Sequence, residues 1–315
     1  MSSRLASISV DLDSLGHYCR IQGLPESILD ERARSLVWAT AIPRYLELFS
    51  SVGTPATFFV IASDLSDARL APVLKTSASA GVELANHSFS HDYALSRRSR
   101  VEIEADLRQA HEAITTQTGV APVGFRAPGY TLSPAMLQAV AGLGYRYDSS
   151  TFPAAPYYLA KASVMKTLAA LGRPSRAILD SPNVLLAPRV PYRPSLEAPY
   201  RRGDAPLVEL PMAVTPLARV PFIGTFATSM PWPLVEATFR RLRHDRHLNF
   251  ELHAIDVLDA SDGIPDALAR QQRDVGVPVR EKLSRLRRLF TWMGDDRQRV
   301  TLADAASRLS GQLDG

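Results

Sequence analysis

The sequence predicts an α/β fold in which parallel strands form a closed or nearly closed sheet with helices on its outside. Strand-like and helix-like segments alternate along most of the chain, which is the pattern of such folds. Clusters of polar residues follow the predicted strands, at the edge where the chemistry of α/β barrels collects. The chain has 315 residues, 46% of them hydrophobic and 22% charged, and barrels of this length commonly form one domain. We therefore expect residues 1–315 to form a single domain.

The first half of the chain predicts units of strand, helix and strand. Segment 6–12 (ASISVDL) alternates small or apolar residues and ends in acidic ones, as a buried strand does where it opens into a site. A helix over about 32–51 follows, and 57–61 (TFFVI) has the β-branched and aromatic residues of a second strand. A helix over about 70–80 then leads into a strand at 82–85.

The second half continues this alternation around one interruption. An amphipathic helix is expected over about 100–118. A shorter helix is expected over 133–143, with Ser133 as its N-cap and Gly144 beyond its end. Further extended segments are expected at 122–126, 145–148, 207–210, 248–253 and 299–302.

The interruption covers about 153–206 and is rich in Pro, Arg and Ala. It contains a helix candidate at about 157–171, and it has eight Lys or Arg against three Asp or Glu. Long insertions in barrels often bind ligands, so we expect this one to recognise the substrate; the alternative is a helix packed on the barrel. Apolar side chains beside cations would suit a carrier lipid with its phosphate, or the bilayer interface. These residues are Tyr157, Tyr158, Leu159, Val164, Met165, Leu168 and Leu171, with Arg173, Arg176, Arg189, Arg193, Arg201 and Arg202.

Charge and cysteine content narrow the function classes. The formal net charge is +4 and the pI is near 9.3, an excess too small to indicate a nucleic-acid-binding protein. A mildly basic surface could meet a phosphate-bearing substrate or an anionic membrane face, or it could be ordinary solvated charge. The single cysteine, Cys19, excludes an internal disulfide and a multi-cysteine metal site.

No segment of the sequence indicates export or a membrane span. The N-terminal residues lack the apolar stretch of a secretion signal, and no run approaches the roughly 20 apolar residues that a bilayer requires. We therefore expect a cytoplasmic protein without a transmembrane segment. Peripheral contact at the inner membrane face stays open.

Two clusters of metal-ligand type follow predicted strands. Asp11 and Asp13 are two residues apart on a strand, so both carboxylates can face one pocket. His87 and His91 are four residues apart and can present their ring nitrogens to one metal. Each pattern alone also occurs in surface turns or by coincidence. Together, an Asp, His, His set would leave coordination positions open for water and substrate.

A third cluster ends the predicted strand at 248–253. Histidine titrates near neutrality, so His253 at this strand end could act as a general acid or base. The alternative is a hydrogen-bonded core histidine. Asp256 and Asp259 follow closely and could orient its ring, or could begin the next loop.

These clusters, with Arg126-Ala127-Pro128-Gly129 between the second and the third, resemble the ordered motifs of the NodB-type polysaccharide deacetylases, carbohydrate esterase family four. That family has an acidic pair on its first strand, an HxxxH motif with Ser or Thr inside, an RxP turn and a late LxH motif. The resemblance spans about 8–253. It implies a distorted (β/α)7 TIM-like barrel and a metal-dependent hydrolase acting on carbon–nitrogen bonds other than peptide bonds.

The resemblance also implies a role for each motif. One divalent metal would be held by Asp13, His87 and His91; zinc is the first expectation, and cobalt, nickel and iron share its preference for such ligands. Further residues of the motifs would act in catalysis, namely Asp11 as the base that activates water, Arg126 as the group that holds Asp11 ionised, and His253 as the acid that protonates the leaving amine. The residues expected at the oxyanion or the substrate are Gly129, through its amide, Tyr130 and Asp148.

The acidic motif, DLDS, departs from the family's usual adjacent aspartates followed by glycine. It is similar to the branch that contains peptidoglycan deacetylase-like, allantoinase-like and aminoarabinose-lipid deformylase members. We therefore expect removal of an acetyl or formyl group from an amino sugar, which could be a polysaccharide precursor or lipid-linked. A cyclic amide hydrolase and a non-catalytic carbohydrate-binding barrel are the alternatives, and the presence of Asp11, Arg126 and His253 argues against the second.

Overall fold

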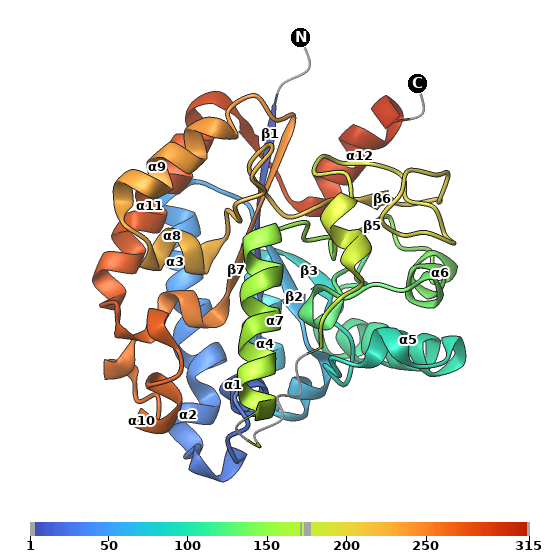
Figure 1. Ribbon diagram of the computed structural model, residues 1–315. Helices are drawn as coiled ribbons and strands as arrows, with labels where there is room; N and C mark the ends of the chain where they lie inside the picture. Colours follow the sequence, from blue (N-terminus) through green and yellow to red (C-terminus); the bar gives the residue numbers. More distant parts are fainter. Residues whose placement is uncertain (1–3, 171, 173–177, 314–315) are drawn as a thin grey trace.

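The computed structural model describes residues 4–170, 172 and 178–313. Its strands form one parallel sheet that curls into a barrel with helices outside, which confirms the expected fold class (Figure 1). The strand order is β6-β5-β4-β3-β2-β1-β7, and β8 pairs with the start of β1. The strands are β1 (Leu5–Asp11), β2 (Thr57–Val60), β3 (Glu83–Asn86), β4 (Gly124–Phe125), β5 (Tyr147–Asp148), β6 (Val208–Glu209), β7 (His247–His253) and β8 (Gln298–Arg299).

The helices that were predicted from sequence form with small shifts. They are α4 (Leu70–Ser79), α5 (Arg100–Thr118), α6 (Pro134–Gly142) and, in the insertion, α7 (Ala155–Ala170). Ser133 caps α6 as expected, since its side chain accepts the Met136 amide. The helix expected over 32–51 divides into α2 (Glu31–Leu36) and α3 (Ile42–Val52), joined by a π-helical turn.

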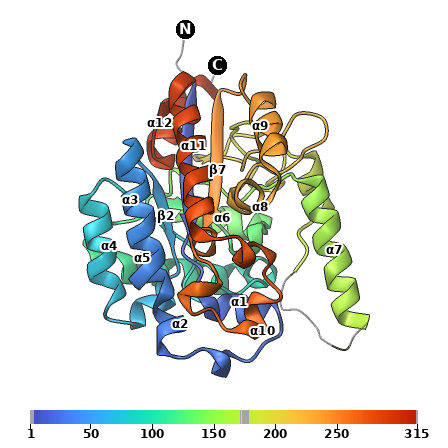
Figure 2. The same cartoon turned by 90° about the vertical axis from the view of Figure 1, so that its left-hand side faces the viewer.

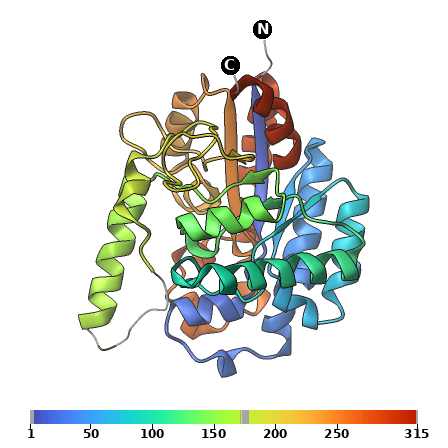
Figure 3. The ribbon, with the colours of Figure 1, turned by 90° about the vertical axis from the view of Figure 1, so that its right-hand side faces the viewer.

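The remaining helices had no specific sequence prediction. They are α1 (Leu15–Ile21), α8 (Gly224–Ser229), α9 (Trp232–Arg241), α10 (Asp266–Ala269), α11 (Val279–Asp296) and α12 (Leu302–Leu313). None of the helices in the described part of the chain combines the length and the apolar character that a bilayer span requires. Figures 2 and 3 show α7 at the side of the molecule, standing away from the helices around the sheet.

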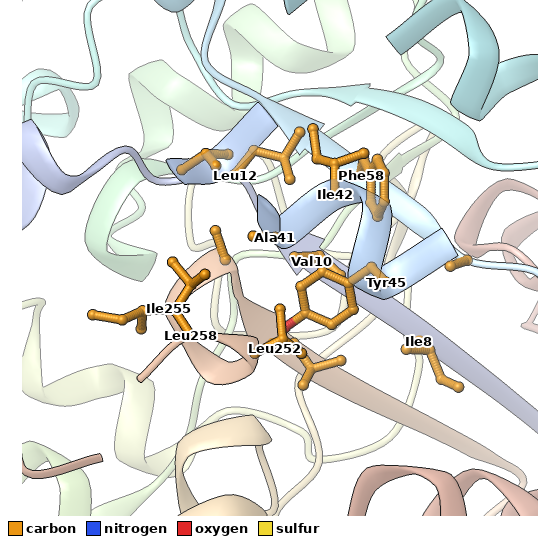
Figure 4. Close-up of a cluster of buried hydrophobic side chains, with 14 of the residues drawn as sticks. Ile8, Val10, Leu12, Ala41, Ile42, Tyr45, Phe58, Leu252, Ile255 and Leu258 are labelled. Atoms are coloured by element: carbon orange, nitrogen blue, oxygen red, sulfur yellow. The ribbon is translucent and has the colours of Figure 1, made fainter. Parts of the chain in front are cut away.

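Alternation along β1 separates the two faces of the sheet. Ile8, Val10 and Leu12 belong to the apolar layer between the sheet and the surrounding helices, where Tyr45 of α3 also lies (Figure 4). Ser9 and Asp11 face the barrel interior, because both contact the Arg126 guanidinium there. The alternation read from the sequence therefore produces an apolar outer face and a polar inner face.

Polar side chains fill the lower part of the barrel interior. The Glu83 carboxylate accepts hydrogen bonds from the Thr57 and Tyr147 hydroxyls, each at 2.8 Å, and from the Ala303 amide at 3.0 Å. The N-terminus of α12 is thereby fixed at the amino-terminal end of the barrel, where β3 begins. His247 lies nearby on β7, and its Nε2 is 2.9 Å from the Ser7 hydroxyl.

The segment after β6 closes the gap between the two ends of the strand order. The Ala213 amide donates to the Asn249 carbonyl of β7 at 2.9 Å, and the Asn249 side chain donates to the Leu210 carbonyl at 2.8 Å. These bonds satisfy backbone groups that an open sheet edge would leave unpaired.

Lowering the pH should destabilise this fold through His247. Burial, reinforced by the positive charge of Arg297, lowers the pKa of His247 to about 3. The unfolded chain takes up a proton near pH 6.5 and the folded chain does not, so stability is full above that pH and is lost as the pH falls toward 3. We expect this residue to lower the free energy of unfolding by up to about 1.4 kcal/mol per pH unit in that window.

Denaturant unfolding of the wild type and His247→Asn between pH 7 and pH 4.5 measures this contribution. Asparagine keeps a hydrogen-bonding group beside Ser7 but cannot take up a proton, so the variant should lose less stability per pH unit than the wild type. His244→Asn, at an exposed position, is the matched control and should keep the wild-type dependence. The same pH dependence in His247→Asn and wild type would contradict this account.

Candidate functional site

The polar clusters predicted from sequence gather at one cavity at the carboxyl ends of the strands. The cavity has a volume of about 470 Å³. Most of the expected site residues line it, namely Asp11, Asp13, His87, Gly129, Tyr130 and His253. Arg126 lies directly behind Asp11, and His91 lies beside Asp13.

The loop after β3 holds the two histidines of the HxxxH motif in place by local hydrogen bonds. The Asn86 side-chain oxygen accepts the Ser88 amide at 2.7 Å, and the Ser88 hydroxyl accepts the His91 amide at 3.0 Å. Ser88 and His91 have left-handed backbone conformations, with φ of 68° and 49°. Asp106 of α5 accepts two further loop amides, at 2.8 and 3.1 Å. Left-handed conformations cost energy in residues other than glycine. The side-chain hydrogen bonds from Asn86, Ser88 and Asp106 therefore stabilise a loop conformation that places the two histidines.

The metal-ligand candidates come together as the sequence predicted. Asp13 Oδ1 lies 3.4 Å from His91 Nε2 and 3.6 Å from His87 Nε2. Ligand atoms bound to zinc at about 2.0–2.1 Å with tetrahedral angles lie about 3.3 Å apart, close to these separations. His87 Nδ1 lies 2.7 Å from the Arg126 carbonyl and can only donate to it, which leaves the Nε2 lone pair free to face the cavity.

Unpaired polar atoms in this trio support the fit to a metal. Within the described residues, His91 Nδ1, His91 Nε2 and Asp13 Oδ1 have no hydrogen-bond partner, although all three atoms are buried. Unpaired buried polar atoms are costly unless an ion or water satisfies them. Burial alone would raise the pKa of Asp13, but His91 and His87 hold it well below its ordinary value. Burial lowers the pKa of His91 to about 4. An ionised carboxylate and a neutral imidazole are the forms that bind a divalent cation.

Asp11 is held by a buried ion pair with Arg126. Arg126 Nη1 donates to Asp11 Oδ1 at 2.6 Å, and both side chains are almost fully buried. The remaining guanidinium groups donate to Ser9 and Ser149 at 2.9 Å. The Phe59 ring lies under the guanidinium, 4.0 Å from its carbon. Charge-assisted hydrogen bonds of this kind offset part of the cost of burying the two side chains.

His253 has a carboxylate partner that sequence reasoning missed. Its Nδ1 lies 2.9 Å from Glu251 Oε1, and its Nε2 lies 3.0 Å from the Tyr130 hydroxyl. Burial would lower the pKa of His253, but Glu251, with Asp13 and Asp11, raises it well above the ordinary value. Glu251 precedes His253 by two residues on β7, so the same alternation that paired Asp11 with Asp13 places both on one face.

The two aspartates after His253 hold the backbone rather than the ring. Asp256 accepts the His253 amide at 2.9 Å, and burial raises the pKa of Asp256 to about 7. Asp259 accepts the Val279 amide at the start of α11 at 2.6 Å. The carboxylate beside the imidazole is therefore Glu251, and not Asp256 or Asp259. The two aspartates fit the alternative expectation that they begin the next loop.

Gly129 and Tyr130 form the turn that closes one side of the cavity. Gly129 has a φ of 63°, and a Cβ atom there would lie 2.6 Å from the Tyr93 ring. Glycine is therefore required both by conformation and by space. The Tyr130 hydroxyl reaches His253 across the cavity.

Asp148 does not line the cavity. It pairs with Glu209 in the register of β5 and β6, and its Oδ1 accepts the Ser150 hydroxyl at 2.7 Å. Burial raises the pKa of both carboxyls. Tyr147, its neighbour, points into the barrel toward Glu83, so Asp148 points to the other face of the sheet. The prediction that Asp148 contacts the substrate is therefore not supported, because its side chain does not line the cavity.

The insertion contributes its helix to the cavity, but its arginines within the described residues lie elsewhere. Tyr157, Val164 and Met165 of α7 line the cavity. Arg189 pairs with Asp245 at 2.6 Å, and Arg193 donates to Ser310 at 2.8 Å. Arg201 and Arg202 are exposed and do not line it. Leu171, Arg173 and Arg176, which the prediction included, lie outside the described residues, as does the side chain of Leu168.

Comparisons with known proteins agree with the motifs. Residues 35–147 match the family model described as polysaccharide deacetylase. A peptidoglycan deacetylase from Helicobacter pylori is 27% identical over 157 residues, which are 49% of this chain and 53% of that protein. The matched region thus spans about half the length of this curated relative.

Solved structures with similar folds cover nearly the whole chain. A candidate polysaccharide deacetylase from Mycobacterium smegmatis has a TM-score of 0.64 at 17% identity and covers 99% of this chain and 92% of that one. PuuE allantoinase has a TM-score of 0.58 at 15% identity and covers 98% and 91%. Likeness at these identities concerns the fold. The family-model match makes residues 35–147 similar to the polysaccharide deacetylases, in agreement with the HxxxH and RxP motifs that lie in this region.

Proposed function

We propose that this protein is a metal-dependent hydrolase that removes an N-acyl group, acetyl or formyl, from an amino sugar, either free or lipid-linked. The observation that carries the proposal is the set of buried, unpaired ligand atoms of Asp13 and His91, with His87, in the cavity that also contains Asp11 and His253. An inert binding barrel would have no use for an ionised base and a protonated acid in the same cavity.

A divalent cation bound by Asp13, His87 and His91 would supply Lewis acidity toward the amide carbonyl and toward the attacking water. Zinc suits the ligand set, and cobalt, nickel and iron share the preference. The other tasks fall to side chains of the chain itself.

Asp11 takes the proton of the attacking water as its oxygen bonds to the carbonyl carbon. Arg126 keeps Asp11 ionised and fixes its second oxygen toward the cavity, since the first is bound by the guanidinium. His253 donates a proton to the nitrogen as the carbon–nitrogen bond breaks, and a carboxylic acid and an amine result. Glu251 stabilises the protonated imidazole until that transfer.

The first test concerns the metal. Purified protein should contain a single divalent ion per chain, and His87→Ala should lose it, because a two-ligand remnant binds weakly. Elemental analysis after dialysis measures the content independently of activity. His244→Ala, at an exposed histidine, is the control and should keep its metal. Full metal content and full activity in His87→Ala would show that the ligand assignment is wrong.

The second test concerns Asp11 and His253. Asp11→Asn and His253→Ala should fold and bind metal but lose about 10²–10⁴-fold in turnover, the usual worth of general acid or base catalysis. Release of acetate or formate from a panel of N-acyl amino sugars and cyclic amides measures it. The Asp11 variant should be impaired on all amides, whereas the His253 variant should be impaired least on anilides, whose amines leave easily.

Near-normal turnover in both variants would refute the mechanism. Hydrolysis of cyclic amides alone would instead favour the allantoinase-like alternative. Circular dichroism and metal content of each variant separate loss of chemistry from loss of fold.

The third test concerns Glu251 as a positioning residue. Because the Glu251 charge raises the pKa of His253, Glu251→Gln should lower that pKa. An acid must be protonated to act, so the falling high-pH limb of the kcat/KM profile should move to lower pH. Glu251→Asp keeps the charge and should restore part of the shift. An unchanged high-pH limb in Glu251→Gln would exclude this role.

A further inference from the structure

The cavity that holds the polar centre continues into an apolar groove. Away from Asp13 and His253, its walls are α7 on one side and the segment 221–230, which includes α8, on the other. The apolar residues that line this part of the cavity are Val164 and Met165 of α7, Ile223, Phe226 and Met230 of segment 221–230, and Ile21 of α1.

This apolar surface extends to the rim of the groove. Val164 is 56% exposed and Met230 is 40% exposed, although both line the cavity. Leu159 of α7 and Leu234 of α9 are also exposed, at 66% and 47%. Leu159 and Val164 belong to α7, which in Figure 2 stands at the side of the molecule, away from the helices around the sheet. Exposed apolar surface that continues into a pocket usually has a ligand to cover it.

A bare sugar fits this groove poorly. Each sugar hydroxyl placed against an apolar wall would lose its hydrogen bonds to water without replacement. The hydroxyls of Thr225 and Ser229 in the wall already donate to Asp256 and to the Thr225 carbonyl. Lys161 is directed back toward the reacting end, with Nζ 3.4 Å from the Gly129 carbonyl. A separate cavity of about 830 Å³ beyond Tyr93 has the charged, polar and aromatic lining that sugars need, including Arg20, Glu26, Trp38 and Asp92.

From this contrast we infer that the substrate is an amphiphile, whose hydrocarbon chain lies between α7 and segment 221–230 while its amide lies at Asp13, His87 and His253. The inference rests on the proposed function, because it takes amide cleavage as the reaction of this site. The chain belongs either to the acyl group that is released or to the aglycone of the amino sugar. Both sources present the same hydrocarbon chemistry to the groove.

Chain length should therefore govern catalytic efficiency. Each methylene that enters the groove should raise kcat/KM about fourfold, since its transfer from water is worth about 0.8 kcal/mol. Two series assayed with metal-loaded protein distinguish the sources. One is N-acyl glucosamine with acyl groups from acetyl to octanoyl, and the other is N-acetylglucosamine carrying alkyl aglycones from methyl to octyl. We expect a rise of at least tenfold along one of them.

A pair of variants on α7 locates the effect. Ala160 lines the groove and Ala169 does not, and both are exposed alanines of the same helix. Ala160→Asp puts a charge beside the hydrocarbon, so the ratio of octyl-chain to short-chain kcat/KM should fall about tenfold or more, whereas Ala169→Asp should keep the wild-type ratio. Loss of the ratio in both variants would point to damage to α7 and would overturn the assignment of the groove.

The outcomes keep this inference apart from the proposed function. Cleavage of acetyl substrates with no gain along either series would overturn the groove assignment and leave the deacylase proposal standing. If no amide is cleaved, the proposed function fails, and binding of the fluorescent apolar probe N-phenyl-1-naphthylamine then decides on the groove. Weaker probe binding in Ala160→Asp than in Ala169→Asp would support the groove, and equal binding in the two would overturn it.

Discussion

The buried ion pair between Arg126 and Asp11 is the interaction on which the rest of the site depends. The Arg126 guanidinium donates hydrogen bonds to Asp11 of β1 and to Ser149, which follows β5. It therefore connects strands from both sides of the barrel. The carbonyl of the same residue accepts from His87 and thereby sets which imidazole nitrogen faces the cavity. One residue thus positions the proposed base and sets the tautomer of a proposed metal ligand. Leaving either charge of such a pair alone typically costs about 3–5 kcal/mol.

Burying this ion pair requires a polar barrel interior, and the polar positions can be recognised in the sequence. On β1, Ser9 and Asp11 alternate with Val10 and Leu12, so one face bonds the guanidinium while the other packs under the helices. Where strands are long, this period of two allowed both the strand and its inward residues to be predicted. That Asp11, Asp13, His87 and His253 lie at one cavity was predicted in this way or from the motifs that follow such strands, and their catalytic and metal-binding roles stay predictions.

The misses have physical causes in the same terms. Glu251 obeys the alternation rule but was read only as part of the strand, because the motif ends at His253. Asp148 lies on a strand of two residues, too short for its facing to be read from pattern, and its inward neighbour Tyr147 takes the interior position. Arg189 belonged to a basic segment by composition, yet its charge is balanced by Asp245, which is distant in sequence. Residues next to Arg189 in the sequence give no indication of an ion-pair partner 56 residues away.

The two walls of the cavity are held in place by different forces. The polar wall rests on strands and on a loop whose amides are bonded by Asn86 and Asp106, so its geometry is fixed by the barrel itself. The apolar wall is α7, which has apolar side chains but little of the main core around it. Changes in α7 can therefore alter what the cavity accepts while leaving Arg126 and its partners undisturbed. Under the proposed function, the reaction would depend on the buried polar wall and the choice of substrate on α7, so separate parts of the chain would carry the two tasks.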